Sequence, residues 1–385
     1  MLVLAIALLG TGLAVDGSMR LEGRAGSVVD GQDPNSVAWS GDVLATAPGP
    51  DGTLRLGLQP SAVVSQQSEV LVRGFAEAGL RLDRGWLRVR QRLGYGQVDL
   101  SPLAATTALA PGEVLQPVQP PPASRFVSVQ ESNTAVELDL AASNRLRFTS
   151  QAAWAVTGGA NAIARETLPL ARGPQARAAL EWRATRLDTV RSELTGSDTR
   201  YSNGRRASVA GLTTGWRTVL TRESELSLAA GPGVGRAETV EIPGEAPKVT
   251  ILPYLLASAD YRLTVKETVV SLGSSVEPMG DPLSGDVIER GSLRASVGWN
   301  PPHGIGWSAR VIGSLALTSG SGGPTSARSG DQFLQGELGA TLPLGPSSSL
   351  SAGARAAFAS RPLPGQPGKQ WGAFLGYTVQ FPLVR

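Results

Sequence analysis

Two runs of alternating residues, SLRASVGW (292–299) and IGWSARVIGSLALT (305–318), are joined by the turn sequence NPPHG (300–304). In both runs apolar and polar side chains alternate, which is the period of a β-strand with two different faces. One face therefore carries large apolar side chains such as Leu293 and Leu315, and the other carries serines and arginines. Each arm is about ten residues long, the length that a tilted strand needs to cross the hydrocarbon of a bilayer. The stretch predicts a membrane-spanning β-hairpin.

The same alternation recurs along the chain from Thr53 to the C-terminus. Counting the arms predicts about 16 strands, with 14–18 as the range, because strand ends read from a sequence shift by ~2–4 residues. Short connections alternate with mostly longer Gly/Pro-rich ones, as in membrane barrels with short periplasmic turns, longer external loops and an even strand number. A sandwich would use only about seven to nine strands. We therefore predict an all-β fold, a closed antiparallel transmembrane β-barrel over residues 52–385.

The N-terminal part of the chain lacks this clear alternation. Residues 2–14 form an apolar run that ends in small residues, so residues 1–14 are predicted to be a signal peptide. No Lys or Arg precedes the run, which suggests a truncated start; the alternative is a buried N-terminal strand or helix. Residues 15–51 are rich in Gly, Asp, Ser and Pro, and we expect them to form a periplasmic extension or a small plug.

The composition argues against several kinds of chemistry. The chain has no cysteine and a single histidine, His303, which lies in the NPPHG turn. Thiol catalysis, histidine-based hydrolysis and a multi-histidine metal site are therefore not expected. The glycines of Gly231-Pro232-Gly233-Val234-Gly235 lie within a strand and open no helix, so they are interpreted as room for bending or close packing rather than a phosphate loop. We predict that the protein is not an enzyme and holds no cofactor or metal.

Arginines make up most of the positive charge, with 35 Lys and Arg against 32 Asp and Glu. They are spread over the strands rather than gathered in one basic patch, so no nucleic-acid partner is expected. Aromatic residues near the arm ends fit the girdles that flank the apolar band of membrane barrels. These residues are Trp86, Trp154, Trp182, Trp216, Trp299, Trp307, Trp371 and Tyr377.

The last arm contains Gly376-Tyr377-Thr378-Val379-Gln380-Phe381, which resembles the C-terminal assembly signal of bacterial outer-membrane β-barrel proteins. Gly376, Val379 and Phe381 match that signal. The chain departs from it by continuing for four residues after Phe381 and by having Phe374 two positions before the glycine. The resemblance implies a porin-like protein of the outer membrane of a Gram-negative bacterium. Its implied partners are outer-membrane lipid and the barrel-assembly machinery; the oligomeric state is not specified.

The polar strand face is predicted to line the barrel interior. Its pore-lining candidates are Arg88, Arg90, Arg92, Glu137, Asp139, Arg147, Arg177, Glu181, Arg183, Arg294, Arg310, Glu337 and Arg355. Arginines exceed carboxylates among these residues, and rings of basic side chains favour anions. Arg88, Arg90 and Arg92 occupy three successive positions on one strand face. They are interpreted either as a constriction that contacts anions or as a ladder paired with carboxylates.

Two functions remain open at this level. At about 16 strands the lumen exceeds what inward side chains fill, which predicts a porin-like channel for small solutes, anions among them. The alternative is a non-conducting surface receptor, adhesin or anchor barrel for a partner complex. The proline-rich loop 100–125 and the extension 15–51 motivate this alternative, because either segment could block the pore.

Overall fold

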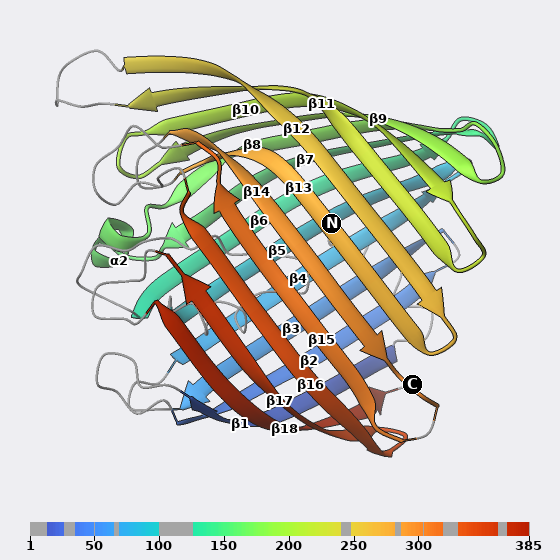
Figure 1. The fold of residues 1–385 in the computed structure, drawn as a ribbon, viewed down its shortest axis with the longest axis vertical. Helices are drawn as coiled ribbons and strands as arrows, with labels where there is room; N and C mark the ends of the chain where they lie inside the picture. Colours follow the sequence, from blue (N-terminus) through green and yellow to red (C-terminus); the bar gives the residue numbers. More distant parts are fainter. Residues whose placement is uncertain are drawn as a thin grey trace.

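The computed structural model describes residues 14–26, 35–49, 51–64, 69–99, 126–239, 248–281, 286–302, 304–318, 330–360 and 368–384. These residues form one closed antiparallel sheet of 18 strands and one short helix, α2 (Ala162–Thr167). Figure 1 shows the strands running obliquely around the barrel. Within the described part of the chain, no helix is long and apolar enough to span a membrane. The predicted fold class, a closed antiparallel all-β barrel, is confirmed.

Each strand pairs with its neighbours in the sequence, and β1 also pairs with β18, which closes the sheet. The strands are β1 (Ala14–Gly26), β2 (Ser36–Gly49), β3 (Gly52–Val64), β4 (Glu69–Leu82), β5 (Gly85–Asp99), β6 (Phe126–Ala141), β7 (Leu146–Gly159), β8 (Ala171–Arg183), β9 (Asp188–Tyr201), β10 (Arg206–Val219), β11 (Ser224–Thr239), β12 (Lys248–Val265), β13 (Thr268–Gly280), β14 (Val287–Trp299), β15 (Gly306–Ala316), β16 (Gln332–Gly345), β17 (Ser348–Ala359) and β18 (Lys369–Val384).

The first two strands correct the prediction for residues 15–51. That segment is neither a plug nor an extension, because β1 and β2 are part of the barrel wall. Their alternation is hard to recognise in the sequence, since glycines such as Gly17 and Gly23 replace large apolar residues on one face of β1. The barrel therefore has 18 strands rather than 16, within the predicted range. Residues 1–13 lie outside the described residues, so the signal peptide over 1–14 stays a prediction.

The two ends of the barrel differ in their connections. The turns between β4 and β5, β12 and β13, and β16 and β17 are two residues each, and they lie at the end where β1 begins and β18 ends. The strand ends that the longer connections join lie at the opposite end, where β1 ends and β2 begins (Figure 1). In outer-membrane barrels the short turns face the periplasm. The loop 100–125 lies outside the described residues.

The outward face of the barrel is a band of large apolar side chains. Directly paired residues of antiparallel strands point to the same side of a sheet, so the registers define one face all the way round. Leu194, Leu338 and Leu375 on the outward face are 55–57% exposed to the surroundings. A soluble protein would leave this apolar area in contact with water, whereas in a membrane it meets lipid.

Seven of the eight predicted girdle aromatics lie on this outward face, each between 42% and 61% exposed. Trp299 of β14 pairs directly with Trp307 of β15 near the short-turn end. Trp86 is the exception, because it pairs with Asp139 and Arg81 and so points inward. The prediction of an interfacial role is therefore wrong for Trp86.

The lipid-facing band can be tested at the middle of β9. Leu194→Arg should lower the free energy of unfolding by about 2–4 kcal/mol, because it places a cation in hydrocarbon. Thr195→Arg is the matched control: its side chain points inward beside Arg177 and should be tolerated. Urea unfolding in lipid vesicles and heat-modifiable gel mobility would measure both. Equal stability of the two variants would contradict a lipid-facing band.

Candidate functional site: the barrel interior

The face opposite the apolar band encloses the barrel interior. The registers place all thirteen pore-lining candidates on this one face: Glu137, for example, pairs with Arg88 and with Gln151, which in turn pairs with Arg177. Continuing the registers adds interior charges that the sequence reasoning left out. They are Asp16, Arg20, Glu22, Arg24, Asp42, Arg55, Arg73, Glu77, Arg81, Glu131, Arg191, Glu193, Arg217, Glu225, Asp260, Arg262, Glu277 and Arg290. The same period of two could have identified most of them.

Interior arginines and carboxylates form ion pairs across neighbouring strands. Arg147 donates through Nε to Asp139 at 2.7 Å, and Arg177 Nε lies 2.6 Å from Glu193. On the opposite part of the wall, Arg355 donates to Glu337 at 2.8 Å. Arginines outnumber carboxylates over the interior face as a whole, but this pairing reduces the field that a passing solute meets.

The Arg88, Arg90 and Arg92 run belongs to this ladder. Arg90 donates to Glu77 of β4 at 2.9 Å, and Arg88 lies 3.6 Å from Glu137 of β6. Carboxylates therefore flank the run on both neighbouring strands. Of the two interpretations that the sequence left open, the paired ladder describes this geometry, and a cluster of bare cations does not.

Glu22 is the most enclosed carboxylate at the seam between β1 and β18. Its side chain is 4% exposed and accepts hydrogen bonds from Arg20 at 2.5 Å, Arg24 at 2.8 Å and Arg355 at 3.2 Å. The Arg355 guanidinium also lies 4.3 Å from the centre of the Phe374 ring. Glu22 thereby links β1 to β17 inside the barrel, and Arg355 in turn contacts Phe374 of β18.

The predicted assembly-signal residues lie at this same seam. Gly376 faces inward and pairs with Glu22; a Cβ there would come within 3.4 Å of Arg20 Nε, so glycine leaves room for that side chain. Val379 and Phe381 have the opposite orientation, outward. The Phe381 ring covers Gly17, where a Cβ would lie only 2.7 Å from it. Recognition of these residues by the assembly machinery stays a prediction.

The barrel wall parts between β12 and β13. β12 pairs with β11 along its whole length but with β13 only from Ala257 to Val265. Beyond that point β13 continues to pair with β14, and both contact the non-neighbouring strands β10 and β11. The end of the β13–β14 hairpin therefore folds inward over the interior face of the wall. We call residues 277–281 and 286–288 the inward tip.

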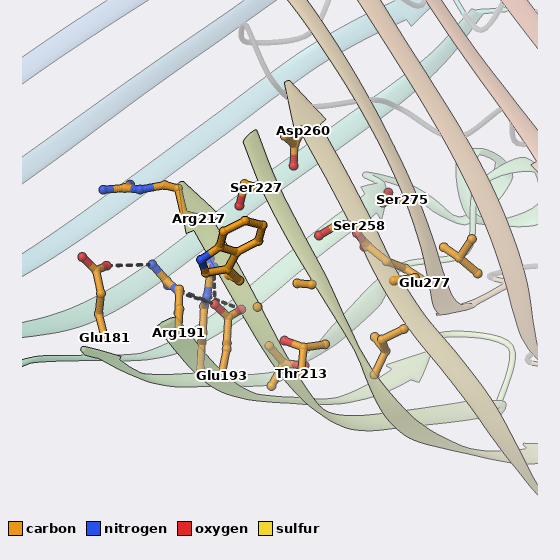
Figure 2. Close-up of a pocket in the computed structure, with 18 of the residues that line it drawn as sticks. Glu181, Arg191, Glu193, Thr213, Arg217, Ser227, Ser258, Asp260, Ser275 and Glu277 are labelled. Carbon is orange, nitrogen blue, oxygen red and sulfur yellow. Dashed lines mark hydrogen bonds and ion pairs between the residues drawn. The ribbon is translucent and has the colours of Figure 1, made fainter. Parts of the chain in front are cut away.

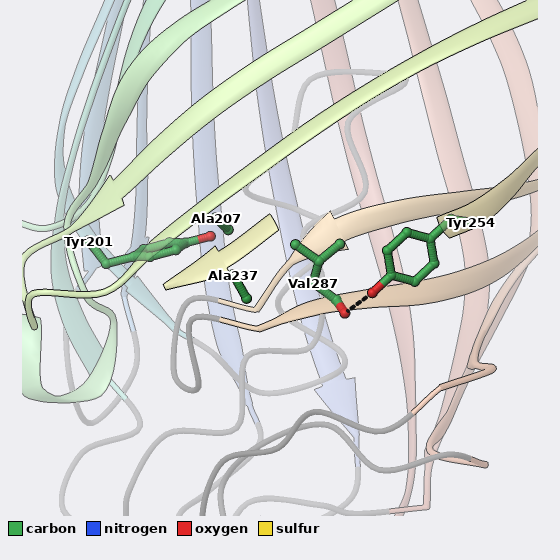
Figure 3. Packing of buried hydrophobic residues seen from close by; sticks show 5 residues of the cluster. All are labelled: Tyr201, Ala207, Ala237, Tyr254 and Val287. Carbon is green, nitrogen blue, oxygen red and sulfur yellow. Dashed lines mark hydrogen bonds between the residues drawn. The ribbon is translucent and has the colours of Figure 1, made fainter. Parts of the chain in front are cut away.

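A buried cluster of Tyr201, Ala207, Ala237, Tyr254 and Val287 holds the inward tip in place (Figure 3). The Tyr254 hydroxyl donates to the backbone carbonyl of Val287 at 2.6 Å. Gly280 fits against Tyr201 so closely that a Cβ would lie 2.4 Å from the phenol oxygen. The neighbouring Ile288 is buried almost completely. The tip narrows the interior at the long-loop end.

The glycines of the segment 231–235 make this packing possible. Gly231, Gly233 and Gly235 all point inward, and a Cβ on Gly233 would lie 2.9 Å from Leu256 Cδ1. A Cβ on Gly235 would lie 2.6 Å from both Tyr254 and Val287. The structure thus supports the interpretation as close packing, and no phosphate loop is formed.

A cavity of about 570 Å³ opens into the lumen below the inward tip. Figure 2 shows Glu181, Arg191, Glu193, Arg217 and Asp260 around it, with ion pairs drawn as dashed lines. Threonine and serine hydroxyls from β9 to β13 complete the polar lining.

The described residues contain no group of three or more His, Cys, Asp or Glu placed to hold a metal ion. His303 lies outside the described residues. The absence of enzymatic activity stays a prediction.

A closed barrel with an apolar outer band and a charged, hydroxyl-rich interior defines a transmembrane β-barrel with a porin-like fold. The chain matches the model of the EpsX exopolysaccharide export family over residues 55–382, which include β4–β17 entirely. It therefore belongs to this family. No curated protein matches the chain.

Solved structures share the fold at low sequence identity. OccAB2 of Acinetobacter baumannii has a TM-score of 0.50 and 9% identity, covering 97% of this chain and 98% of its own. The outer membrane protein opdK of Pseudomonas aeruginosa has a TM-score of 0.50 and 12% identity, covering 96% and 99%. The FrpB iron transporter of Neisseria meningitidis (F3-3 variant) has a TM-score of 0.51 and 8% identity, covering 93% and 66%. These likenesses concern the fold alone.

The seam cluster predicts the effect of removing its carboxylate charge. Glu22→Gln should lower the free energy of unfolding by about 3 kcal/mol, the low end for breaking a buried ion pair, because Arg20 and Arg24 are partly exposed. Glu137→Gln, at a 33% exposed carboxylate, should cost less than about 1 kcal/mol. Guanidinium unfolding in detergent would measure both, and equal losses would contradict a special role of Glu22.

The inward tip predicts a change in pore size. Gly280→Val should push the tip away from Tyr201 and Ala207, since a Cβ would lie 2.8 Å from Ala207 Cβ. Because the tip packs on the interior face of the wall, this displacement moves it further into the lumen, and the single-channel conductance of the variant in planar bilayers should therefore fall. Gly336→Val is the control, because the nearest atom to its Cβ is 3.9 Å away. An unchanged conductance in a folded Gly280→Val variant would show that the tip does not limit the pore.

Proposed function

We propose that this protein is the outer-membrane conduit through which an exopolysaccharide leaves a Gram-negative cell. The observation that carries the proposal is the family match across nearly the whole barrel, on a fold that encloses a polar interior. In this proposal the porin-like channel keeps the role predicted from the sequence, but its cargo is a hydroxyl-rich polymer rather than a small solute.

The charge pattern of the interior supports such a cargo. A polymer contacts the wall at many points at once, so strong attraction at each point would hold it in the pore; conduction needs contacts that are weak and numerous. Cross-strand pairs such as Arg177–Glu193 and Arg355–Glu337 neutralise much of the local charge. Their remaining hydrogen-bonding capacity and the neighbouring serines and threonines suit a polyhydroxylated chain.

The proposal also includes how the protein itself reaches and enters the outer membrane. Residues 1–14 serve as the signal peptide, and the barrel-assembly machinery recognises the last strand through Gly376, Val379 and Phe381. The surrounding partner is outer-membrane lipid. We also infer that the protein has no enzymatic activity, because the sequence offers neither a thiol nor more than one histidine.

Deleting the gene should abolish surface exopolysaccharide while polymer accumulates in the periplasm, and expression of the intact chain should restore export. The measurement is quantitative sugar analysis of surface and periplasmic fractions. The purified barrel should also show stable open steps in planar bilayers, with a modest preference for chloride because arginines outnumber carboxylates. Undiminished surface polysaccharide in the deletion strain would contradict the conduit; electrical silence would favour the receptor or anchor alternative.

A further inference from the structure

The cavity below the inward tip lies at the level where the wall parts. Its lining includes Leu256 and Ala257 of β12 and Ser275 and Val276 of β13. Their strands stop pairing at this level, where Ala257 faces Val276. With about 570 Å³, the cavity falls within the roughly 300–1,000 Å³ of small-molecule sites. It remains open to the lumen, so a chain passing through the pore can enter it sideways.

The charges of the cavity are mutually compensated. Arg177 and Arg191 both bind Glu193, at 2.6 and 2.9 Å, and Arg217 binds Glu225 at 3.3 Å. The lining as a whole holds four arginines and four carboxylates, with Glu277 and the loosely paired Asp260 and Arg294 among them, so the cavity carries no net charge. The cavity therefore favours a ligand without net charge.

Its remaining polar groups are available to a ligand with many hydroxyls. Asp260 and Arg294 are half exposed and only loosely paired, at 3.8 Å. A sugar hydroxyl both donates and accepts, so one sugar unit can donate to the Asp260 carboxylate and accept from the Arg294 guanidinium. Ser227 and Ser258 supply further hydroxyls, and Leu256 offers an apolar contact for the C–H face of a sugar ring.

We propose that this cavity is a binding site for an uncharged segment of a polysaccharide chain on its way through the barrel. The inference rests on the proposed function and extends it, because it assigns a place of contact and a charge class to the cargo. The site would retain the chain just below the inward tip, where the tip narrows the interior.

The absence of cysteine in the chain allows a direct test. Ser258→Cys introduces a single thiol in the cavity, and Ser18→Cys introduces one on the interior face of β1, which is separated from the cavity strands β8–β14 by several strands in either direction around the closed sheet. Labelling by a membrane-impermeant maleimide is compared between cells that synthesise exopolysaccharide and cells in which its synthesis is blocked. We expect synthesis to slow labelling at position 258 at least threefold and to leave position 18 nearly unchanged.

The outcomes separate this inference from the proposed function. Equal protection at both positions would mean that a chain fills the lumen without a preferred site, which overturns the site but keeps the conduit. Protection at neither position overturns the site as well. In that case the deletion strain tests the proposed function separately. Loss of surface polysaccharide in that strain would support the conduit, and undiminished export would contradict it.

A second measurement tests the charge class with the purified barrel in detergent. Oligosaccharides from partial hydrolysis of the exported polymer, separated into neutral and acidic fractions, are assayed by equilibrium dialysis. The neutral fraction should bind more tightly than the acidic one. Attaching a bulky maleimide to the thiol of the folded Ser258→Cys variant should weaken that binding at least tenfold, whereas the same adduct on the Ser18→Cys variant should not. Tighter binding of the acidic fraction, or no effect of the adduct at position 258, would overturn the assignment.

Discussion

Lipid offers no hydrogen-bond partners, and this constraint governs the whole structure. Every backbone N–H and C=O in the hydrocarbon layer needs a partner within the protein, so a spanning sheet must close on itself. Here β1 meets β18 in a long antiparallel register, and Gly17 and Gly376 make room for side chains from the opposite strand. Glu22 adds an interior link from β1 to Arg355 of β17, whose guanidinium contacts the Phe374 ring of β18. Closure thus depends on backbone pairing first and on one buried carboxylate second.

The same constraint explains where the wall can open. Past Ala257, β12 has no β13 partner, and its Leu255 amide donates instead to the Glu289 carboxylate at 3.2 Å. Pro253 on β12 and Pro278 on β13 both lie in the segments that have separated. Proline lacks an N–H, so strands tolerate it where one side has no neighbour. The parting lies at the long-loop end of the barrel, and the inward tip turns the freed hairpin end into the interior.

The barrel interior carries many charged side chains, but arginines and carboxylates that pair across strands largely cancel each other's electrostatic field in the lumen. Cross-strand ion pairs in water-filled space contribute little stability each, since solvent screens them. Their main effect is on what the lumen attracts. Arginines held by carboxylates, as Arg90 is by Glu77, keep donors for weak hydrogen bonds without forming a strong anion trap. In the cavity, Asp260 and Arg294 are also paired with each other, but their longer distance of 3.8 Å leaves both side chains more available for hydrogen bonds to a ligand.

The sequence by itself determined which face each residue of a strand takes, because the period of two is a local property of the chain. Leu315 and Arg310 could be assigned to opposite faces of β15 before any partner strand was known, and the barrel class followed from repeating that pattern. Only the tertiary structure decided that β1 and β2 complete the wall. Glycines interrupt the alternation of apolar and polar residues in this segment, and the strand that pairs with β1, β18, lies at the other end of the sequence. The tertiary structure also decided which carboxylate meets Arg90 and where β13 leaves β12. Such contacts depend on register between strands, which alternation within one strand does not specify.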